Sequence, residues 1–148
     1  MPYSLISLAY EEGIKVEYWD FEPPLEGVYW RKPGLPPVIG ISRRLFDNRR
    51  HFRSVLAEEL GHHFTTVGCY VPEVWLHYAD RLNAGRAEYR AARWAAAYLI
   101  PADKLCETLS RGTTDVWELA DRFEVDEPLV RLRLTTLQAT RGVVGGKT

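Results

Sequence analysis

Ala57-Glu58-Glu59-Leu60-Gly61-His62-His63 is the stretch on which the interpretation of this chain depends. Residues four apart on an α-helix lie one turn apart on the same side, so Glu58 and His62 can reach one metal ion together. Carboxylate oxygen and imidazole nitrogen are both ordinary zinc ligands. Glu59 borders the same face, where a general base can take a proton from a water molecule that the metal activates. The stretch therefore predicts a metal-dependent hydrolytic site on a helix.

Two other interpretations of this stretch stay open. The pattern Glu-Glu-x-x-His has Glu58 where the zinc-protease motif His-Glu-x-x-His has its first histidine. Because short patterns also match by chance, the two glutamates could simply form the solvated face of a helix. In a second register, Glu59 and His63 are the ligand pair. We favour the first register, because the second leaves Glu58 without a role and brings the metal nearer the apolar face; His63 is then a surface or supporting group.

The elements around the motif predict that its helix follows a small sheet. The helix is expected from about residue 48 to residue 66, with a short helix at 4–12, a strand at 14–21 and a hairpin of strands 27–30 and 38–41 before it. Apolar residues recur at helical spacing along the motif helix and form its buried face: Phe52, Val55, Leu56, Leu60 and Phe64. Glu58 lies well away from this face, as a metal ligand at the edge of a core should.

A third metal ligand is predicted at Glu88, near the start of an alanine-rich helix over 86–100. The residues that follow Glu88 on its own side of this helix are apolar: Ala91, Ala92, Ala95 and Leu99. A carboxylate on such a stripe costs free energy unless it is paired or bound to a metal. The alternative is an exposed first-turn glutamate that the helix dipole favours. Beside the first motif we favour the metal, and Glu58, His62 and Glu88 would leave a fourth position for water.

Peptide hydrolysis also needs a hydrogen-bond donor beside the developing oxyanion. Three candidates lie between the two motif helices: Tyr70, His77 and Tyr78. We place His77 and Tyr78 ahead as catalytic candidates, although each of the three could instead be a packed aromatic or surface residue. The surrounding segment, 71–83, is expected to form a short helix that ends near residues 83–85.

The two motifs resemble those of the ImmA/IrrE metallo-endopeptidases of bacteria, phages and mobile elements. The matching segments are 56–64 and 88–101, and the second resembles the family pattern Glu-x-x-Ala-x-x-Phe-Ala-x-x-Leu-Leu-x-Pro with Trp94 in the aromatic place. The resemblance covers about residues 14–137, although only the two motifs are specific. It places the family's third zinc ligand on Glu88.

The resemblance implies an α+β, zincin-like minimal metallopeptidase. We expect a small antiparallel sheet or hairpin packed on the active-site helix, followed by a helical C-terminal part. The expected organisation is a metallopeptidase core over 1–109, a helix-turn-helix-like extension over 110–141 that packs on the core, and a flexible tail over 142–148.

The function that the resemblance implies is the cleavage of a small helix-turn-helix repressor of a phage, mobile element or stress regulon. Zinc is the expected metal. Because Glu58 replaces the family's usual histidine, the site is harder, and Mn²⁺ or Fe²⁺ also becomes conceivable. The alternative is a non-catalytic regulator of the same fold that binds a repressor or DNA. Glu59 favours the enzyme, because a binding module has no need of a base at that position.

Three further helices are expected at 103–109, 116–123 and 128–137, and the last two resemble a helix-turn-helix with Asp126 as N-cap. A DNA-reading second helix would normally begin with more polar and basic residues than Glu127-Pro128-Leu129. We therefore expect this pair to pack on the core and do not expect direct nucleic-acid binding.

Composition excludes several classes of protein. At 148 residues and 46% hydrophobic residues the chain can bury one core, and its net charge of −1 gives no electrostatic case for nucleic acid or an acidic membrane. No apolar run approaches the ~20 residues that span a bilayer. The two cysteines, Cys69 and Cys106, form no Cys-x-x-Cys pair, and the N-terminal residues lack the pattern of a secretory signal. We expect a cytoplasmic protein with reduced thiols, and the resemblance implies a protein substrate.

Overall fold

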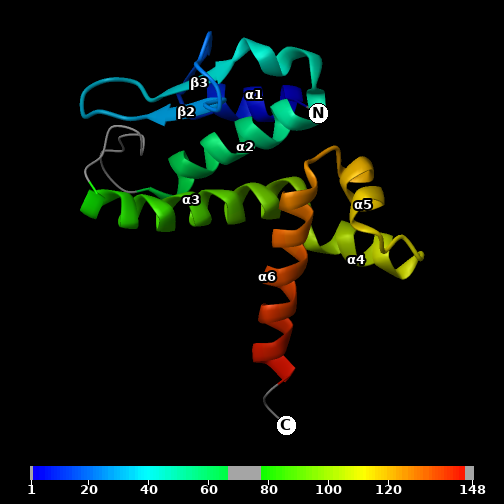
Figure 1. The fold of residues 1–148 in the computed structure, drawn as a ribbon. Coiled ribbons are helices and arrows are strands. Elements are labelled where there is room, and N and C mark those ends of the chain that lie inside the picture. The colour runs from blue at the N-terminus through cyan, green and yellow to red at the C-terminus, as the bar shows by residue number, and fades with distance from the viewer. Residues whose placement is uncertain (1, 67–77, 146–148) are drawn as a thin grey trace.

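The computed structural model describes residues 2–66 and 78–145, with side-chain environments for residues 4–66 and 85–139. Within these ranges the chain forms six α-helices, one 3-10 helix and three strands (Figure 1). The small sheet lies against the motif helix, and the C-terminal helices follow on the other side. The expected fold class, α+β with the arrangement of a small zincin-like domain, is confirmed. In the described ranges, no helix is both long and apolar enough to cross a membrane.

The sheet has the strand order β1–β3–β2, with β1 at Lys15–Trp19, β2 at Gly27–Trp30 and β3 at Val38–Ser42. β2 and β3 form the expected antiparallel hairpin, but β1 pairs with β3 in parallel, so the sheet is mixed rather than antiparallel throughout. β3 is the most apolar and most buried strand, which accounts for its central position between β1 and β2. After β3, one turn of 3-10 helix, η1 (Arg43–Asp47), leads to the motif helix.

The helices α1 (Pro2–Glu11) and α2 (Arg49–Thr65) lie where the sequence predicts them. Gly13 adopts a φ of +71° and ends the first, a conformation that glycine adopts without a Cβ penalty. The side chain of Asn48 caps α2 by accepting a hydrogen bond of 3.1 Å from the backbone N–H of His51. α1 contacts β1 and α2, and α2 contacts β2 and β3. The motif helix is therefore held from two sides.

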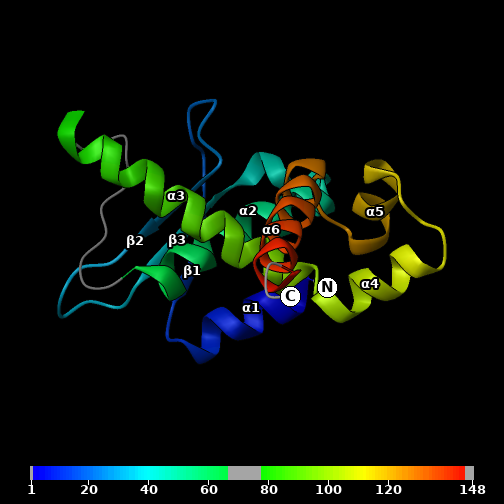
Figure 2. The same cartoon turned by 90° about the horizontal axis from the view of Figure 1, so that it is seen from below.

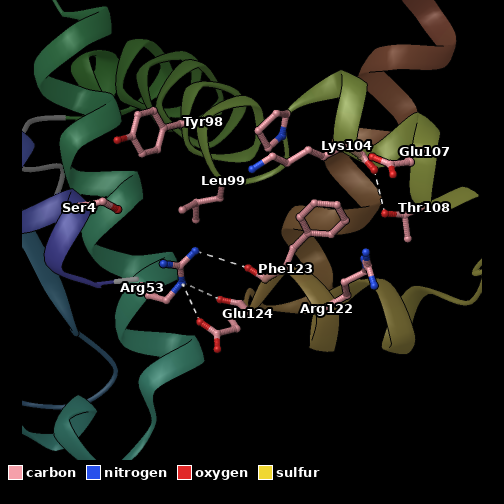
Figure 3. Close-up of a pocket in the computed structure, with 11 residues that line it drawn as sticks. Ser4, Arg53, Tyr98, Leu99, Lys104, Glu107, Thr108, Arg122, Phe123 and Glu124 are labelled. Carbon is pink, nitrogen blue, oxygen red and sulfur yellow. Dashed lines mark hydrogen bonds and ion pairs between the residues drawn. The ribbon is translucent and has the colours of Figure 1, made fainter.

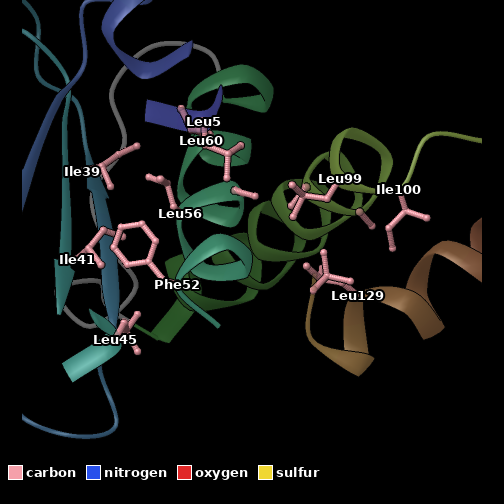
Figure 4. Packing of buried hydrophobic residues seen from close by; sticks show 14 of the residues in the cluster. Leu5, Ile39, Ile41, Leu45, Phe52, Leu56, Leu60, Leu99, Ile100 and Leu129 are labelled. Carbon is pink, nitrogen blue, oxygen red and sulfur yellow. The ribbon is translucent and has the colours of Figure 1, made fainter. Parts of the chain in front are cut away.

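α2 separates two parts of the apolar core (Figure 4). On its sheet side, buried side chains of β3 face those of α1 and α2: Leu5, Ile39, Ile41, Phe52, Leu56 and Leu60. On its other side, buried residues of α3 and the following turn meet α6: Leu99, Ile100 and Leu129. Each fully buried Leu or Ile contributes roughly 1.5–3 kcal/mol. Packing on both sides fixes the position of α2 and of the motif residues that it carries.

α3 (Tyr78–Leu99) is longer than expected, because it passes through residues 83–85, where we expected a helix to end. A single interior glycine such as Gly85 costs a helix only about 1 kcal/mol, which the good helix formers around it offset. α3 packs closely on α2 at Gly61, where an added Cβ would lie 2.3 Å from the carbonyl oxygen of Ala91. The two backbones touch at this point, and only glycine permits the contact. This contact sets how near the side chains of α2 and α3 approach each other.

The C-terminal part consists of α4 (Ala102–Ser110), α5 (Val116–Phe123) and α6 (Glu127–Gly145). α6 packs near the C-terminal end of α3 and extends away from the sheet (Figure 1), and Figure 2 views it almost along its axis. Arg133 of α6 donates a hydrogen bond of 2.8 Å to the carbonyl oxygen of Ile100. The helix continues to Gly145, and the flexibility of the tail over 142–148 stays a prediction.

Candidate metal centre

The structure brings His62 of α2 and Glu88 of α3 together. The distance between His62 Nε2 and Glu88 Oε1 is 3.1 Å, with His62 almost wholly buried and the Glu88 side chain 48% exposed. The ring of Tyr29, on β2, lies nearly parallel to the His62 ring, with centroids 6.5 Å apart and an interplanar angle of 9°. Two of the three predicted metal ligands therefore meet across the α2–α3 contact, at the boundary between core and solvent.

Glu58 lies one helical turn before His62 on α2. Its pKa is raised from 4.5 to about 7, first by burial and then by the negative charge of Glu88, while His62 lowers it. Glu58 is thus within electrostatic range of both other predicted ligands. Among the residues that the structure describes, however, no three histidine, cysteine or acidic side chains converge on one point. The metal-binding set of Glu58, His62 and Glu88 stays a prediction. Of these three residues, His62 and Glu88 are in contact.

Glu59 lies next to the edge strand β2. Its Oε1 atom is 3.0 Å from the position that a Cβ would occupy on Gly27, and Val55 is nearer still, so a side chain at Gly27 would collide with both. The pKa of Glu59 is raised well above 4.5 by burial, followed by the charges of Glu88 and Glu58. Glu59 therefore packs against Gly27 of β2, and the charges of the predicted ligands Glu58 and Glu88 still affect its pKa.

The chemistry of this cluster fits a divalent metal ion. Three carboxylates, those of Glu58, Glu59 and Glu88, share the neighbourhood of one imidazole, and their mutual repulsion disfavours the ionised forms. A cation held by Glu58, His62 and Glu88 would offset this repulsion. Carboxylate oxygens with one imidazole nitrogen suit zinc, and they also suit the harder ions manganese and iron.

His63 is held by other groups. Its Nδ1 atom lies 2.9 Å from the hydroxyl oxygen of Tyr29, and its Nε2 atom lies 3.1 Å from Oε2 of Glu12 on α1. Both ring nitrogens therefore have protein partners, which disfavours the register in which His63 binds the metal. His63 instead ties α1, β2 and α2 together behind the cluster.

The predicted oxyanion donors cannot be placed in this geometry. Tyr70 and His77 lie outside the described residues, and Tyr78 is the first residue of α3, with a side chain outside the described set. Their roles stay predictions. Cys69 also lies outside the described residues, and Cys106 lies on α4.

The sequence interpretation missed several residues that position α2. Tyr29 and Glu12 contact His63 across 34 and 51 residues of chain. His51 lies between two carboxylates, with Nε2 2.5 Å from Oε2 of Glu26 and Nδ1 hydrogen-bonded to Asp126. Burial lowers the pKa of His51, but the bonds to Asp126 and Glu26 outweigh it and leave the pKa raised above 6.5. No local sequence pattern indicates contacts of this range, since each joins separate elements.

Comparison with known protein families gives a match. The sequence model of the IrrE N-terminal-like domain, peptidase M78, matches residues 9–135, which is most of the chain. A search of curated proteins finds no significant match. The matched range contains both motif helices and all of the described residues of the candidate metal centre.

Proposed function

The chain belongs to the peptidase M78 family, and from this premise we propose that it is a metal-dependent endopeptidase. Membership indicates a function of the metallopeptidase type and implies a metal cofactor. The observation that carries the proposal is the 3.1 Å contact of His62 with Glu88 across two helices, beside two more carboxylates with raised pKa values. A salt bridge between His62 and Glu88 requires only one carboxylate. The two additional carboxylates, Glu58 and Glu59, are expected if the cluster binds a cation.

In this proposal Glu58, His62 and Glu88 hold the metal ion. When bound, the ion supplies Lewis acidity that polarises a carbonyl group and lowers the pKa of water. We expect zinc, with Mn²⁺ or Fe²⁺ as alternatives, because two of the three ligands are carboxylates. Tyr29 keeps the imidazole of His62 in place by packing against its face.

Glu59 is the residue that we assign as general base. In its ionised form it would take a proton from the attacking water and return one to the leaving amine. Its position below Gly27 places the carboxyl group beside β2, which in the described part of the chain pairs with β3 alone. The open edge of such a strand can bind an extended peptide by main-chain hydrogen bonds. A substrate bound in this way would carry its peptide bonds past Glu59.

We further propose that the substrate is a small helix-turn-helix repressor. The resemblance to the ImmA/IrrE endopeptidases supports this choice. A peptide that pairs with the open edge of β2 must be extended. We therefore expect cleavage in a linker between folded parts of the repressor.

Incubation with a helix-turn-helix repressor from the same genome tests the proposal. Glu59→Gln keeps the size of the side chain but removes the base, so cleavage should fall by at least about a hundredfold while the metal content stays unchanged. Glu127→Gln, a change of a partly exposed side chain on α6, is the control and should cleave as the wild type does. Equal cleavage by Glu59→Gln and wild type would contradict the peptidase assignment and favour the non-catalytic regulator.

A further inference from the structure

A separate cavity lies where α2 and α3 meet α4 and α5 (Figure 3). Its volume is about 740 Å³, within the usual range of small-molecule sites. Four helices contribute the side chains that matter here: Arg53, Tyr98, Lys104, Arg122 and Phe123. It contains none of the residues assigned to the metal centre, so the proposed peptidase activity leaves it unexplained.

Arg53 of α2 is the buried cation of this cavity, with a side chain only 7% exposed. Its Nε atom donates to the carbonyl oxygen of Glu124 at 3.1 Å, and one terminal nitrogen makes a long contact of 3.5 Å with that of Phe123. The other terminal nitrogen, Nη1, is buried and has no hydrogen-bond acceptor among the described residues. A buried cationic N–H without an acceptor is costly, and an anionic ligand would remove that cost.

The cavity carries an excess of positive charge. Its three cationic side chains are Arg53, Lys104 and Arg122. Its two carboxylates already face arginines: Glu107 lies 2.7 Å from Arg111, and Glu124 lies 3.6 Å from Arg49 and 4.0 Å from the Nε atom of Arg53. Lys104 and Arg122 form no ion pair with any residue that the structure describes. Their charges are therefore available to a ligand.

The N-terminus of α4 adds to the positive electrostatic potential of the cavity. The N-cap residue Pro101 and Lys104 of the first turn of α4 both lie in the cavity wall, and the helix receives no side-chain cap. The N–H groups of an uncapped first turn and the helix dipole both favour an anion. Asp103, in the same turn, offsets part of the dipole but is not among the lining residues.

We propose that this cavity binds the phosphate group of a small phosphorylated molecule of about nucleotide size. Lys104 and Arg122 contact the phosphate oxygens, and the guanidinium of Arg53 forms the base of the site. The rings of Tyr98 and Phe123 provide apolar surface for the rest of the molecule, and Figure 3 shows Lys104 extending from α4 toward Tyr98. A bound molecule of this kind joins α2, which carries the motif, to α4 and α5. The site stands independently of the proposed peptidase activity.

Calorimetric titration of the full chain with AMP tests the site. We expect saturable binding of one AMP per chain with a Kd below about 1 mM, weakened by added salt, and no binding of adenosine, which lacks the phosphate. Lys104→Gln and Arg122→Gln should each weaken AMP binding about tenfold, since each removes a charge-assisted hydrogen bond. Arg131→Gln, an exposed change on α6, is the matched control and should bind AMP as the wild type does.

Three results would overturn the proposal. The first is the absence of saturable binding of AMP, pyrophosphate and inorganic phosphate alike. The second is equal binding of adenosine and AMP, since phosphate recognition would then be wrong. The third is unchanged AMP affinity in Lys104→Gln and Arg122→Gln, which would place the ligand elsewhere, including on the metal. Both side chains are far less buried than that of Arg53, so these variants should fold, and circular dichroism checks that they do.

Discussion

The two halves of α2 differ in how their charges are compensated. In the N-terminal half, cations meet carboxylates from distant parts of the chain, as where Arg50 lies 2.8 Å from Asp121. In the C-terminal half, negative charge accumulates instead. Glu58 and Glu59 both have raised pKa values because of burial and the repulsion of Glu88. The first turns of α2 thus hold the C-terminal helices through ion pairs and hydrogen bonds, which we call the anchor. The last turns of the same helix carry the candidate metal site.

The difference shows how charged residues that stabilise the fold can be distinguished from charged residues that form a functional site. His51, bound on both sides by carboxylates, has what a buried cation needs to stabilise a fold. A group of like charges destabilises the fold that contains it, and such groups with shifted pKa values gather at functional sites. The N-terminal half of α2 therefore holds the C-terminal helices in place, and the C-terminal half offers ligands. Four variants test this distinction.

The largest effect is expected for Glu88→Ala. Loss of one of three metal ligands should weaken metal affinity about a thousandfold, or about 4 kcal/mol. The metal-free variant should be as stable as the metal-free wild type or more so, because Glu58 and Glu59 lose a like-charged neighbour. Metal analysis of protein purified without chelator, with the partly exposed Glu127→Ala as control, measures the first effect, and thermal unfolding measures the second. Full metal content in Glu88→Ala would show that Glu88 is not a ligand.

Gly61→Ala should destabilise the fold by about 3 kcal/mol, because the new methyl group collides with the rigid backbone at Ala91. The helices must separate, so His62 and Glu88 also move apart. Gly85→Ala is the matched control: no atom lies within 4 Å of its added Cβ, and it should gain up to about 1 kcal/mol. Urea unfolding of both variants measures the difference. Equal stability of the two would contradict the close α2–α3 contact.

His51→Gln should cost about 1 kcal/mol at about pH 6 and little at about pH 9. The bonds to Asp126 and Glu26 raise the pKa of His51 in the folded protein above its unfolded value of 6.5, although burial opposes them. Its contribution to stability is therefore complete below pH 6.5 and is lost as the pH rises through the folded-state pKa. Unfolding curves of wild type and variant across this range give the measurement. A difference that does not change with pH would argue against a charged imidazole.

Arg50→Gln is expected to have the smallest effect, below about 0.5 kcal/mol. Its ion pair with Asp121 is short, but the two side chains are 39% and 76% exposed, and exposed pairs contribute little. Added salt should reduce even this difference. Chemical unfolding at low and high salt measures it, and a loss above 1 kcal/mol would mean that the pair is part of the anchor and not only at its surface.

Local patterns predicted most of the secondary structure. The apolar repeat of Phe52, Leu56 and Leu60 placed α2 within a residue or so of its observed ends. The prediction of antiparallel pairing was wrong for β1, and the predicted start of α3 was also wrong, because contacts between distant parts of the chain determine both. The parallel pairing joins β1 to β3, with β2 between them in the sequence, and the early start of α3 depends on a long helix that tolerates one glycine. Neither effect has a local signal, because each depends on what packs against the element.

The amino-acid sequence by itself determined the types of donor and their order on one helix: Glu58 and His62 four residues apart, with Glu59 beside them. Helical geometry alone makes that relation certain once the helix forms. The tertiary structure decided the rest. It brought Glu88 to His62 through the backbone contact at Gly61, placed Glu59 below β2, and raised the carboxylate pKa values. The physical reason is that distances and burial between elements depend on the packing of the whole chain, which no short stretch of sequence specifies.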